Sequence, residues 1–208
     1  MNDGPILWYF ADPMCSWCWG FSPVIDAVRE AYRERAKISL VLGGLRPGTI
    51  ESLSPQGRED ILHHWHQVHE RTGQPFRFDH ALPDGFVYDT APACRAVAAM
   101  GELEPALLFS MFKAVQSAFY AGGRDVTQAE VLADLAASLG MDARRFELAF
   151  ASQATKARTQ AHFRLARERG VSGFPTLLLQ KESDFYLITR GWQPLAAIRA
   201  SIETGLGK

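Results

Sequence analysis

YFADPMCSWCWGF, residues 9–21, is the segment from which the fold of this chain can be predicted. The apolar run that begins at Ile6 is typical of a buried strand, and it ends at Asp12-Pro13. Two cysteines follow with two residues between them, and a helical pattern begins at once. A Cys-x-x-Cys pair between a strand and a helix indicates a redox-active dithiol rather than half of a zinc site.

The position of Cys15 just before the predicted helix favours its thiolate, which is the nucleophile in disulfide exchange. Unpaired backbone N–H groups and the dipole of a helix N-terminus stabilise an anion there. Cys18 lies one helical turn further on, within reach of a mixed disulfide formed by Cys15. We therefore predict that Cys15 attacks the substrate and that Cys18 resolves the mixed disulfide.

The composition is that of a folded globular protein, with 208 residues, 47% hydrophobic and 22% charged. A net charge of −1 gives no reason to expect nucleic acid or an anionic membrane as a partner. The N-terminus lacks the pattern of a signal peptide and no apolar run is long enough to span a bilayer, so we expect a cytoplasmic protein. Structural disulfides are rare in that compartment, which favours a catalytic pair. The third cysteine, Cys94, lies in a small-residue helical pattern and is predicted to be a buried apolar residue.

The order of the predicted elements divides the chain in two. A strand, a helix (residues 18–34) and a second strand (38–42) predict a parallel β-α-β unit. Residues 54–170 contain almost no strand-like alternation and read as helices, with Thr90, the pair Thr127 and Glu130, and Asp142 as predicted caps. Strands at 176–180 and 185–189 predict an antiparallel hairpin before a last helix. We therefore expect a sheet domain of residues 1–53 plus 171–208, and a helical insertion of residues 54–170.

A second candidate site lies at Phe174-Pro175, directly before the strand at residue 176. Proline has no N–H to pair at the start of a buried strand, so its presence calls for a reason. One interpretation is a cis bond that places Pro175 against the Cys15 sulfur and leaves the backbone of Phe174 to pair with an extended substrate. The alternative is an ordinary trans proline that opens a strand.

Together these features resemble the thioredoxin superfamily: Cys15-Ser16-Trp17-Cys18 after a first strand, a helical insertion, then Gly173-Phe174-Pro175-Thr176 before a hairpin and a closing helix. More narrowly, the chain resembles the DsbA-like branch. The Asp-Pro-Met-Cys-Ser-Trp-Cys-Trp-Gly-Phe block and three shorter blocks resemble its cytosolic bacterial members, often called FrnE-like or predicted protein-disulfide isomerases. The shorter blocks are Gly43-Gly44-Leu45, Thr72-Gly73-Gln74-Pro75-Phe76 and Pro92-Ala93-Cys94-Arg95-Ala96.

The resemblance implies an α/β thioredoxin fold with an inserted all-helical domain and a protein-disulfide oxidoreductase or isomerase activity. Cys15 matches the family's nucleophilic cysteine, Cys18 its resolving cysteine and Pro175 its cis-proline. With Pro175, we expect Ser16, Trp17 and Phe174 to contact substrate. Substrates would be thiols or disulfides, of proteins or small molecules. We expect no metal and no bound cofactor, with glutathione an option as reductant, and a monomer or homodimer.

Two positions depart from the family pattern. Phe174 replaces the Val or Thr common before that proline, so substrate preference is open. The Ser16-Trp17 dipeptide is neither the Pro-His of strongly oxidising members nor the Gly-Pro of thioredoxin. The direction of electron flow is therefore not predicted.

Two other classes compete with this interpretation. Kappa-class glutathione transferases and 2-hydroxychromene-2-carboxylate isomerases share the fold, carry serine where Cys15 stands, and bind glutathione without cycling a disulfide. A non-enzymatic metal-binding module would combine Cys15 and Cys18 with two of the histidines His63, His64, His66 and His69.

Overall fold

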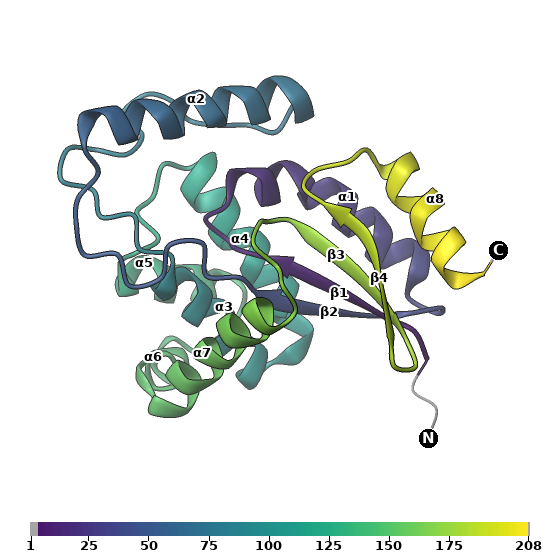
Figure 1. The fold of residues 1–208 in the computed structure, drawn as a ribbon. Coiled ribbons are helices and arrows are strands. Elements are labelled where there is room, and N and C mark those ends of the chain that lie inside the picture. Colours follow the sequence, from purple (N-terminus) through teal and green to yellow (C-terminus); the bar gives the residue numbers. More distant parts are fainter. Residues whose placement is uncertain (1–3, 208) are drawn as a thin grey trace.

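A four-stranded mixed sheet forms the centre of the computed structural model, which describes residues 4–207. The spatial order is β2 (Lys37–Leu42), β1 (Ile6–Ala11), β3 (Thr176–Lys181), β4 (Asp184–Arg190). β1 and β2 are parallel, and β1–β3 and β3–β4 are antiparallel, as the predicted β-α-β unit and hairpin require. The central pair, β1 and β3, thus joins the two ends of the chain (Figure 1).

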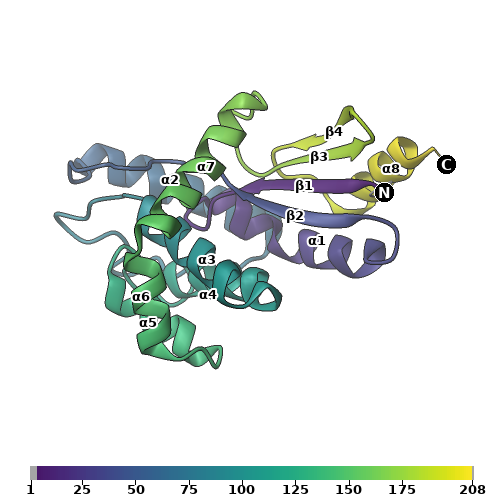
Figure 2. The ribbon, with the colours of Figure 1, turned by 90° about the horizontal axis from the view of Figure 1, so that it is seen from below.

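The two faces of the sheet are covered by different helices. Leu7 and Tyr9 of β1 belong to the main core cluster with α1 (Ser16–Tyr32) and α8 (Leu195–Leu206), which lie on one face (Figure 2). Phe10, the residue after Tyr9, points to the opposite face and belongs to a second cluster with Ala166, near the end of α7. Side chains alternate across a strand, so β1 is buried on both sides.

The residues between β2 and β3 form helices that lie mostly to one side of the sheet (Figure 1). They are α2 (Pro55–Thr72), α3 (Ala91–Leu103), the short 3-10 helix η1 (Pro105–Leu107), α4 (Leu108–Tyr120), α5 (Ala129–Ser138), α6 (Ala143–Ala151) and α7 (Gln153–Glu168). The division into residues 1–53 plus 171–208 and an insertion of residues 54–170 remains our proposal; residues 1–3 and 208 lie outside the described residues.

Some helix starts follow local capping rules. Asp142 caps α6 as predicted, accepting a hydrogen bond from the backbone N–H of Arg145 at 2.7 Å. The α2 helix begins at Pro55, directly after its N-cap Ser54. Ser54 accepts from the N–H of Gly57 at 3.1 Å, and Pro55 occupies the first turn, where its missing N–H costs nothing.

Of the other two predicted caps, one is confirmed in position and one is wrong. Thr90 is the N-cap residue of α3, but its hydroxyl makes no capping bond and instead accepts from the backbone N–H of Arg46 at 3.1 Å, in the loop after β2. The α5 helix has Gln128, not Thr127, as its N-cap, and the Thr127 hydroxyl donates to Asp125 at 2.6 Å. In both cases a turn or tertiary contact competes successfully for the hydroxyl.

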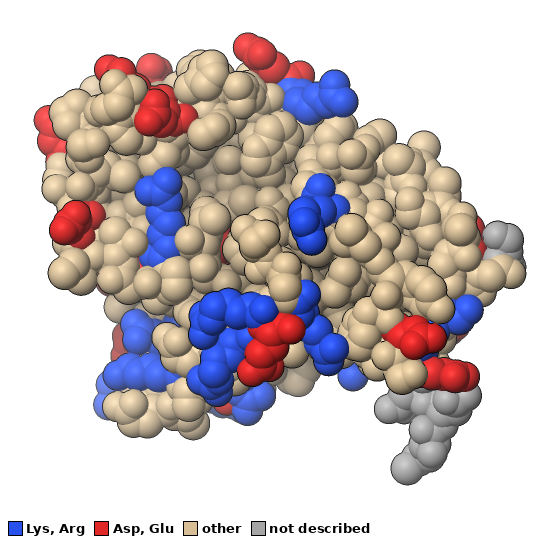
Figure 3. Space-filling view, viewed as in Figure 1, with Lys and Arg blue, Asp and Glu red and all other residues tan. Residues whose placement is uncertain are grey.

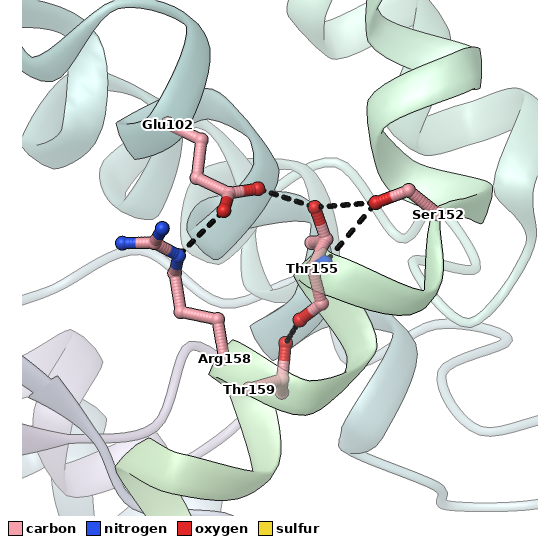
Figure 4. A network of polar contacts seen from close by, with 5 residues as sticks. All are labelled: Glu102, Ser152, Thr155, Arg158 and Thr159. Carbon is pink, nitrogen blue, oxygen red and sulfur yellow. Dashed lines mark hydrogen bonds and ion pairs between the residues drawn. The ribbon is translucent and has the colours of Figure 1, made fainter.

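A polar network ties α3 to the start of α7 (Figure 4). Glu102 accepts hydrogen bonds from the buried Thr155 hydroxyl and from Arg158, the latter at 2.5 Å. Ser152 caps α7 by accepting from the Thr155 N–H at 3.1 Å, and Thr159 donates to the Thr155 carbonyl at 2.8 Å. The network fixes the helix that returns the chain to the sheet.

An aromatic cluster joins the insertion to the N-terminal end of α1. Trp65 is 2% exposed and its ring centroid lies 5.4 Å from Phe119 and 5.0 Å from Tyr120. Trp19 of α1 stacks on Tyr120 at 6.3 Å. The start of α1, with Cys15 at its N-cap and Cys18 in its first turn, is therefore held by the inserted helices as well as by the sheet.

Candidate active site

The two cysteines sit at the N-terminus of α1 in different environments. Cys15 is the N-cap residue, with an extended backbone, and its N–H donates to the Asp12 carbonyl at 3.1 Å. Cys15 is 6% exposed, whereas Cys18, in the first turn, is 0% exposed. Both are free thiols. Of the two, Cys15 borders a surface cavity, and Cys18 is enclosed by the protein.

The structure brings the second candidate site onto the first. The Phe174–Pro175 peptide bond is cis, and the Cys15 thiol donates to the Phe174 carbonyl with 3.5 Å between sulfur and oxygen. The Phe174 ring lies over Gly43, where an added Cβ would fall 2.1 Å from the ring. The Pro175 carbonyl accepts from the Gly191 N–H at 2.7 Å, which fixes the other end of the loop.

A buried carboxylate, which sequence reasoning missed, organises the loops under the dithiol. Asp12 is 0% exposed and accepts from the N–H of Met14 at 2.8 Å and from the N–H of Leu45 at 2.7 Å. The Cys94 thiol also donates to it, at 3.4 Å. Asp12 thus connects the loop that carries Cys15 to the loop after β2. Its place three residues before Cys15 was visible in the sequence, but its partners were not.

Burial sets the electrostatics of the inner groups. Burial raises the pKa of Asp12, although the N–H donors of Leu45 and Met14 act in the opposite direction. Burial also raises the pKa of the Cys18 thiol well above its ordinary value, and the neighbouring Cys15 acts in the same direction. The pKa of Cys94 is raised by burial and by the charge of Asp12. Burial therefore favours the neutral form of both inner thiols, Cys18 and Cys94.

Two open cavities adjoin one another at Trp17 and Phe174, and one of them reaches Cys15. One, of about 700 Å³, is bordered by Cys15 and Ser16 and by polar side chains that include Arg46 and His64. The other, of about 610 Å³, is bordered by Trp192 and by Gln67, Glu70 and Arg71 of α2. Trp17 and Phe174 line both cavities. Three of the four residues predicted to contact substrate line the cavity that contains Cys15: Ser16, Trp17 and Phe174. The fourth, Pro175, lies in the same loop as Phe174.

On the face drawn in Figure 3, Lys and Arg side chains gather in the lower part, over α7, and are sparser near the middle. The histidines of α2 have separate surroundings: His64 borders the cavity with Cys15, and His66 stacks on Phe78 at 3.9 Å. Within residues 4–207, no group of three or more His, Cys, Asp and Glu side chains is placed to hold a metal ion.

Among the helices of the same residues, none is both long and apolar enough to cross a membrane.

Comparison with known families agrees with this geometry. The sequence model of the DSBA-like thioredoxin domain matches residues 6–203. The chain belongs to the DsbA-like thioredoxin family. The predicted α/β thioredoxin fold with inserted helices is confirmed, and the family is one of thiol-disulfide oxidoreductases.

Solved structures similar to this DsbA-like protein include two bacterial proteins that match nearly the whole chain. A Nitrosomonas europaea protein, described as a candidate protein disulfide isomerase, is 48% identical, with a TM-score of 0.93 and coverage of 98% of both chains. The cytosolic disulfide reductase DsbM from Pseudomonas aeruginosa is 31% identical, with a TM-score of 0.79 and coverage of 97% of this chain and 98% of that one. A second structure of DsbM contains glutathione.

Curated relatives of this DsbA-like protein include the ClpXP adapter protein SpxH of Halalkalibacterium halodurans and of Bacillus subtilis, 24% and 23% identical. The matches cover 83% and 82% of this chain. The chain spans only 57% and 56% of the length of these relatives.

Proposed function

We propose that this protein is a protein-disulfide oxidoreductase in which Cys15 is the attacking thiol and Cys18 the resolving thiol. The Cys15 thiolate attacks a substrate disulfide, forms a mixed disulfide and releases one substrate thiol. Cys18 then attacks the Cys15 sulfur, closes the enzyme disulfide and releases the second thiol. Two electrons pass from the enzyme to the substrate, and the reverse sequence oxidises a substrate dithiol.

The observation that carries the proposal is the asymmetry at the start of α1. The more exposed sulfur, Cys15, lies at the helix N-terminus and 3.5 Å from the Phe174 carbonyl, while Cys18 is fully buried behind it. A helix N-terminus stabilises the thiolate that attacks and that later leaves. The depth of Cys18 protects the resolving thiol from external disulfides.

The loop at Phe174-Pro175 is proposed as the wall against which a substrate binds. The Phe174 carbonyl, which accepts from the Cys15 thiol in the free enzyme, could instead accept from a backbone N–H of an extended substrate. Trp17 and Phe174 stand between the two cavities, so the two sides of a substrate disulfide could occupy one cavity each. Ser16 and Pro175 complete this surface.

Glutathione is proposed as the reductant and the cytosol as the place of action. The support comes from DsbM, which is described as cytosolic and has been solved with glutathione. Two glutathione molecules would reduce the Cys15–Cys18 disulfide and leave as glutathione disulfide. The reduction potential, measured against a glutathione buffer, decides the direction: a value near thioredoxin's, about −270 mV, indicates a reductase, and one near about −120 mV an oxidant.

The mechanism is tested with two variants in an insulin-disulfide reduction assay. Cys15→Ser should abolish reduction with an unchanged circular dichroism spectrum. Cys18→Ala should still attack and should accumulate a covalent mixed disulfide, visible by non-reducing electrophoresis and mass spectrometry. If Cys15→Ser kept its rate, the assignment of the nucleophile would be wrong.

A glutathione-dependent transferase or isomerase is the second candidate, because a 2-hydroxychromene-2-carboxylate isomerase shares the fold, with a TM-score of 0.66 at 16% identity. Such an enzyme needs no resolving thiol. Full glutathione-conjugating activity in the Cys18→Ala variant would favour it over the dithiol mechanism.

A further inference from the structure

The cavity that reaches Cys15 is bordered by one permanently charged side chain, and its charge is positive. That side chain is Arg46, and His64, which can also carry a positive charge, borders the same cavity. None of the described residues that line this cavity is Asp or Glu. The adjoining cavity is bordered by both Glu70 and Arg71, so its charges balance. The two spaces beside the dithiol therefore differ in charge.

The side chain of Arg46 is held next to the loop that carries Cys15. Its guanidinium carbon lies 5.3 Å from the centre of the Tyr88 ring, within the range of a cation–π contact. The hydroxyl of the same tyrosine donates at 2.6 Å to the carbonyl of Met14, the residue directly before Cys15. Tyr88 is buried and borders the same cavity. One buried ring therefore contacts both the guanidinium and the backbone that precedes the nucleophile.

The backbone of Arg46 is fixed from two directions. Its N–H donates to the Thr90 hydroxyl at 3.1 Å, and its carbonyl accepts from the Thr90 N–H at 3.3 Å. The N–H of the preceding residue, Leu45, donates to Asp12 at 2.7 Å, which ties this loop to that of Cys15. Because the loop is already ordered, a substrate that binds the guanidinium loses less free energy to ordering it.

The guanidinium has no carboxylate partner of its own. Among residues 4–207, Arg46 forms no ion pair, and its guanidinium contacts the Tyr88 ring. The carboxylate of Asp89 accepts from the backbone N–H groups of Gly48 and Ala91, at 2.7 and 2.9 Å, and does not border the cavity. Arginine binds carboxylates through two parallel N–H groups. An unpaired guanidinium in the cavity of the nucleophile is therefore suited to a carboxylate of the substrate.

We propose that Arg46 determines the charge preference of the enzyme by selecting disulfides with a carboxylate near the sulfur that Cys15 attacks. This deepens the proposed oxidoreductase function and rests on it. In the step concerned, the Cys15 thiolate attacks one substrate sulfur, a bond forms between the two sulfurs, and the S–S bond of the substrate breaks. The departing thiolate takes the electron pair and then a proton from water. The half that stays attached to Cys15 keeps its carboxylate against the guanidinium.

The size of the effect follows from the exposure of Arg46. The residue is exposed, so its attraction for a carboxylate is that of an ion pair in contact with water, which is small and is screened by salt. We expect it to change the rate of attack about three- to fivefold. This corresponds to about 0.7–1 kcal/mol, at 1.4 kcal/mol for each factor of ten.

The test compares three small disulfides of similar size and different charge. They are 3,3′-dithiodipropionate, which is anionic, bis(2-hydroxyethyl) disulfide, which is neutral, and cystamine, which is cationic. Each is added to the reduced chain carrying Cys18→Ala, in which the mixed disulfide on Cys15 accumulates and is measured by acid quenching and mass spectrometry. For each disulfide, the rate with Arg46 is divided by the rate with its replacement. The intrinsic reactivity of the disulfide cancels in that ratio.

The expected result depends on the charge of the disulfide. Arg46→Gln should slow attack on dithiodipropionate about three- to fivefold, change attack on the neutral disulfide less than about 1.5-fold, and speed attack on cystamine about twofold. Arg46→Lys should restore most of the rate with dithiodipropionate, because it keeps the charge but not the two parallel N–H groups. In 1 M NaCl the Debye length falls to about 3 Å, so the effect of Arg46→Gln should shrink to less than about 1.5-fold.

The matched control is Arg33→Gln. It removes the same charge from the far end of α1, about 27 Å from Cys15 along the helix. All three rates should stay unchanged in this variant, which shows that the net charge of the protein is not the cause.

Equal slowing of all three disulfides in Arg46→Gln would overturn the inference, because Arg46 would then support the site without selecting by charge. Unchanged rates with all three would overturn it as well. The proposed function fails in a different way: the Cys18→Ala chain would form no mixed disulfide on Cys15 with any of the three disulfides, and the inference would fall with it.

Discussion

Replacing Asp12 by alanine tests the view that one buried carboxylate holds the two loops around the dithiol. The change removes the acceptor for the N–H groups of Met14 and Leu45, at 2.8 and 2.7 Å, and for the Cys94 thiol. Because Asp12 is fully buried, both N–H groups would be left without a partner unless water entered.

The size of the effect follows from these contacts. A hydrogen bond to a charged group contributes about 1.5–3 kcal/mol, so the two N–H bonds together contribute about 3–6 kcal/mol. Burying the charged carboxylate is itself unfavourable, and this cost is what raises the pKa of Asp12. Removing the carboxylate regains that cost and so offsets part of the lost hydrogen-bond free energy. We expect a net loss of about 2–4 kcal/mol in the free energy of unfolding.

The measurement is urea unfolding followed by circular dichroism, with the reduced protein at pH 7. Asp60→Ala is the control, because Asp60 is an exposed carboxylate with a single hydrogen bond, from Gln56, and should cost less than about 0.5 kcal/mol. Insulin reduction should also slow in Asp12→Ala, since the Asp12–Met14 turn positions Cys15. A loss below about 1 kcal/mol would refute the reasoning, because it would mean that the two bonds do not outweigh the desolvation of the carboxylate.

Three further outcomes are expected. Gly43→Ala should displace the Phe174 ring, since the new Cβ would lie 2.1 Å from it. We expect the free energy of unfolding, measured by thermal unfolding, to fall by about 1–3 kcal/mol. Insulin reduction should slow even at temperatures where the variant is fully folded. Burial lowers the pKa of His162, so below pH 6.5 the unfolded chain binds more protons; stability should fall as the pH drops through 6.5, and His162→Gln should flatten that slope in urea titrations at several pH values. Glu102→Ala leaves the buried Thr155 hydroxyl without its acceptor and should lower the free energy of unfolding in urea by about 1–3 kcal/mol. The double variant Glu102→Ala, Thr155→Val should lose no more than Glu102→Ala alone.

The parts of the fold that sequence reasoning reached are those set by local patterns. The spacing of apolar residues, which differs between strands and helices, placed the ends of each strand within two residues of their positions in the structure. The same spacing separated the helical insertion from the sheet. The cysteine pair and Phe174-Pro175 were recognised because each is a short motif with a strong backbone consequence. That Cys15 and Phe174, 159 residues apart, lie in contact was an expectation from the combined pattern.

What escaped prediction depends on contacts between residues distant in sequence. Thr90 has the side chain of a good cap, but the N–H of Arg46 uses its hydroxyl instead, and nothing near Thr90 in the sequence signals this. Cys94 was expected to be an inert buried residue, yet its thiol donates to Asp12, 82 residues away. Gln116 lies in an apolar helical stripe, where a lone amide gives no indication of its surroundings.

The arrangement of the sheet has a consequence during synthesis on the ribosome. The strand β2 ends at Leu42 and β3, the central partner of β1, begins at Thr176. At about 5–20 residues per second, roughly 7–27 s pass between the synthesis of these two points. During that time β1 presents an unpaired edge, while α2–α7 can pack on one another. An unpaired apolar edge is a site of aggregation or of chaperone binding. Until β3 has been synthesised, only the inserted helices are available to cover the N-terminal segment.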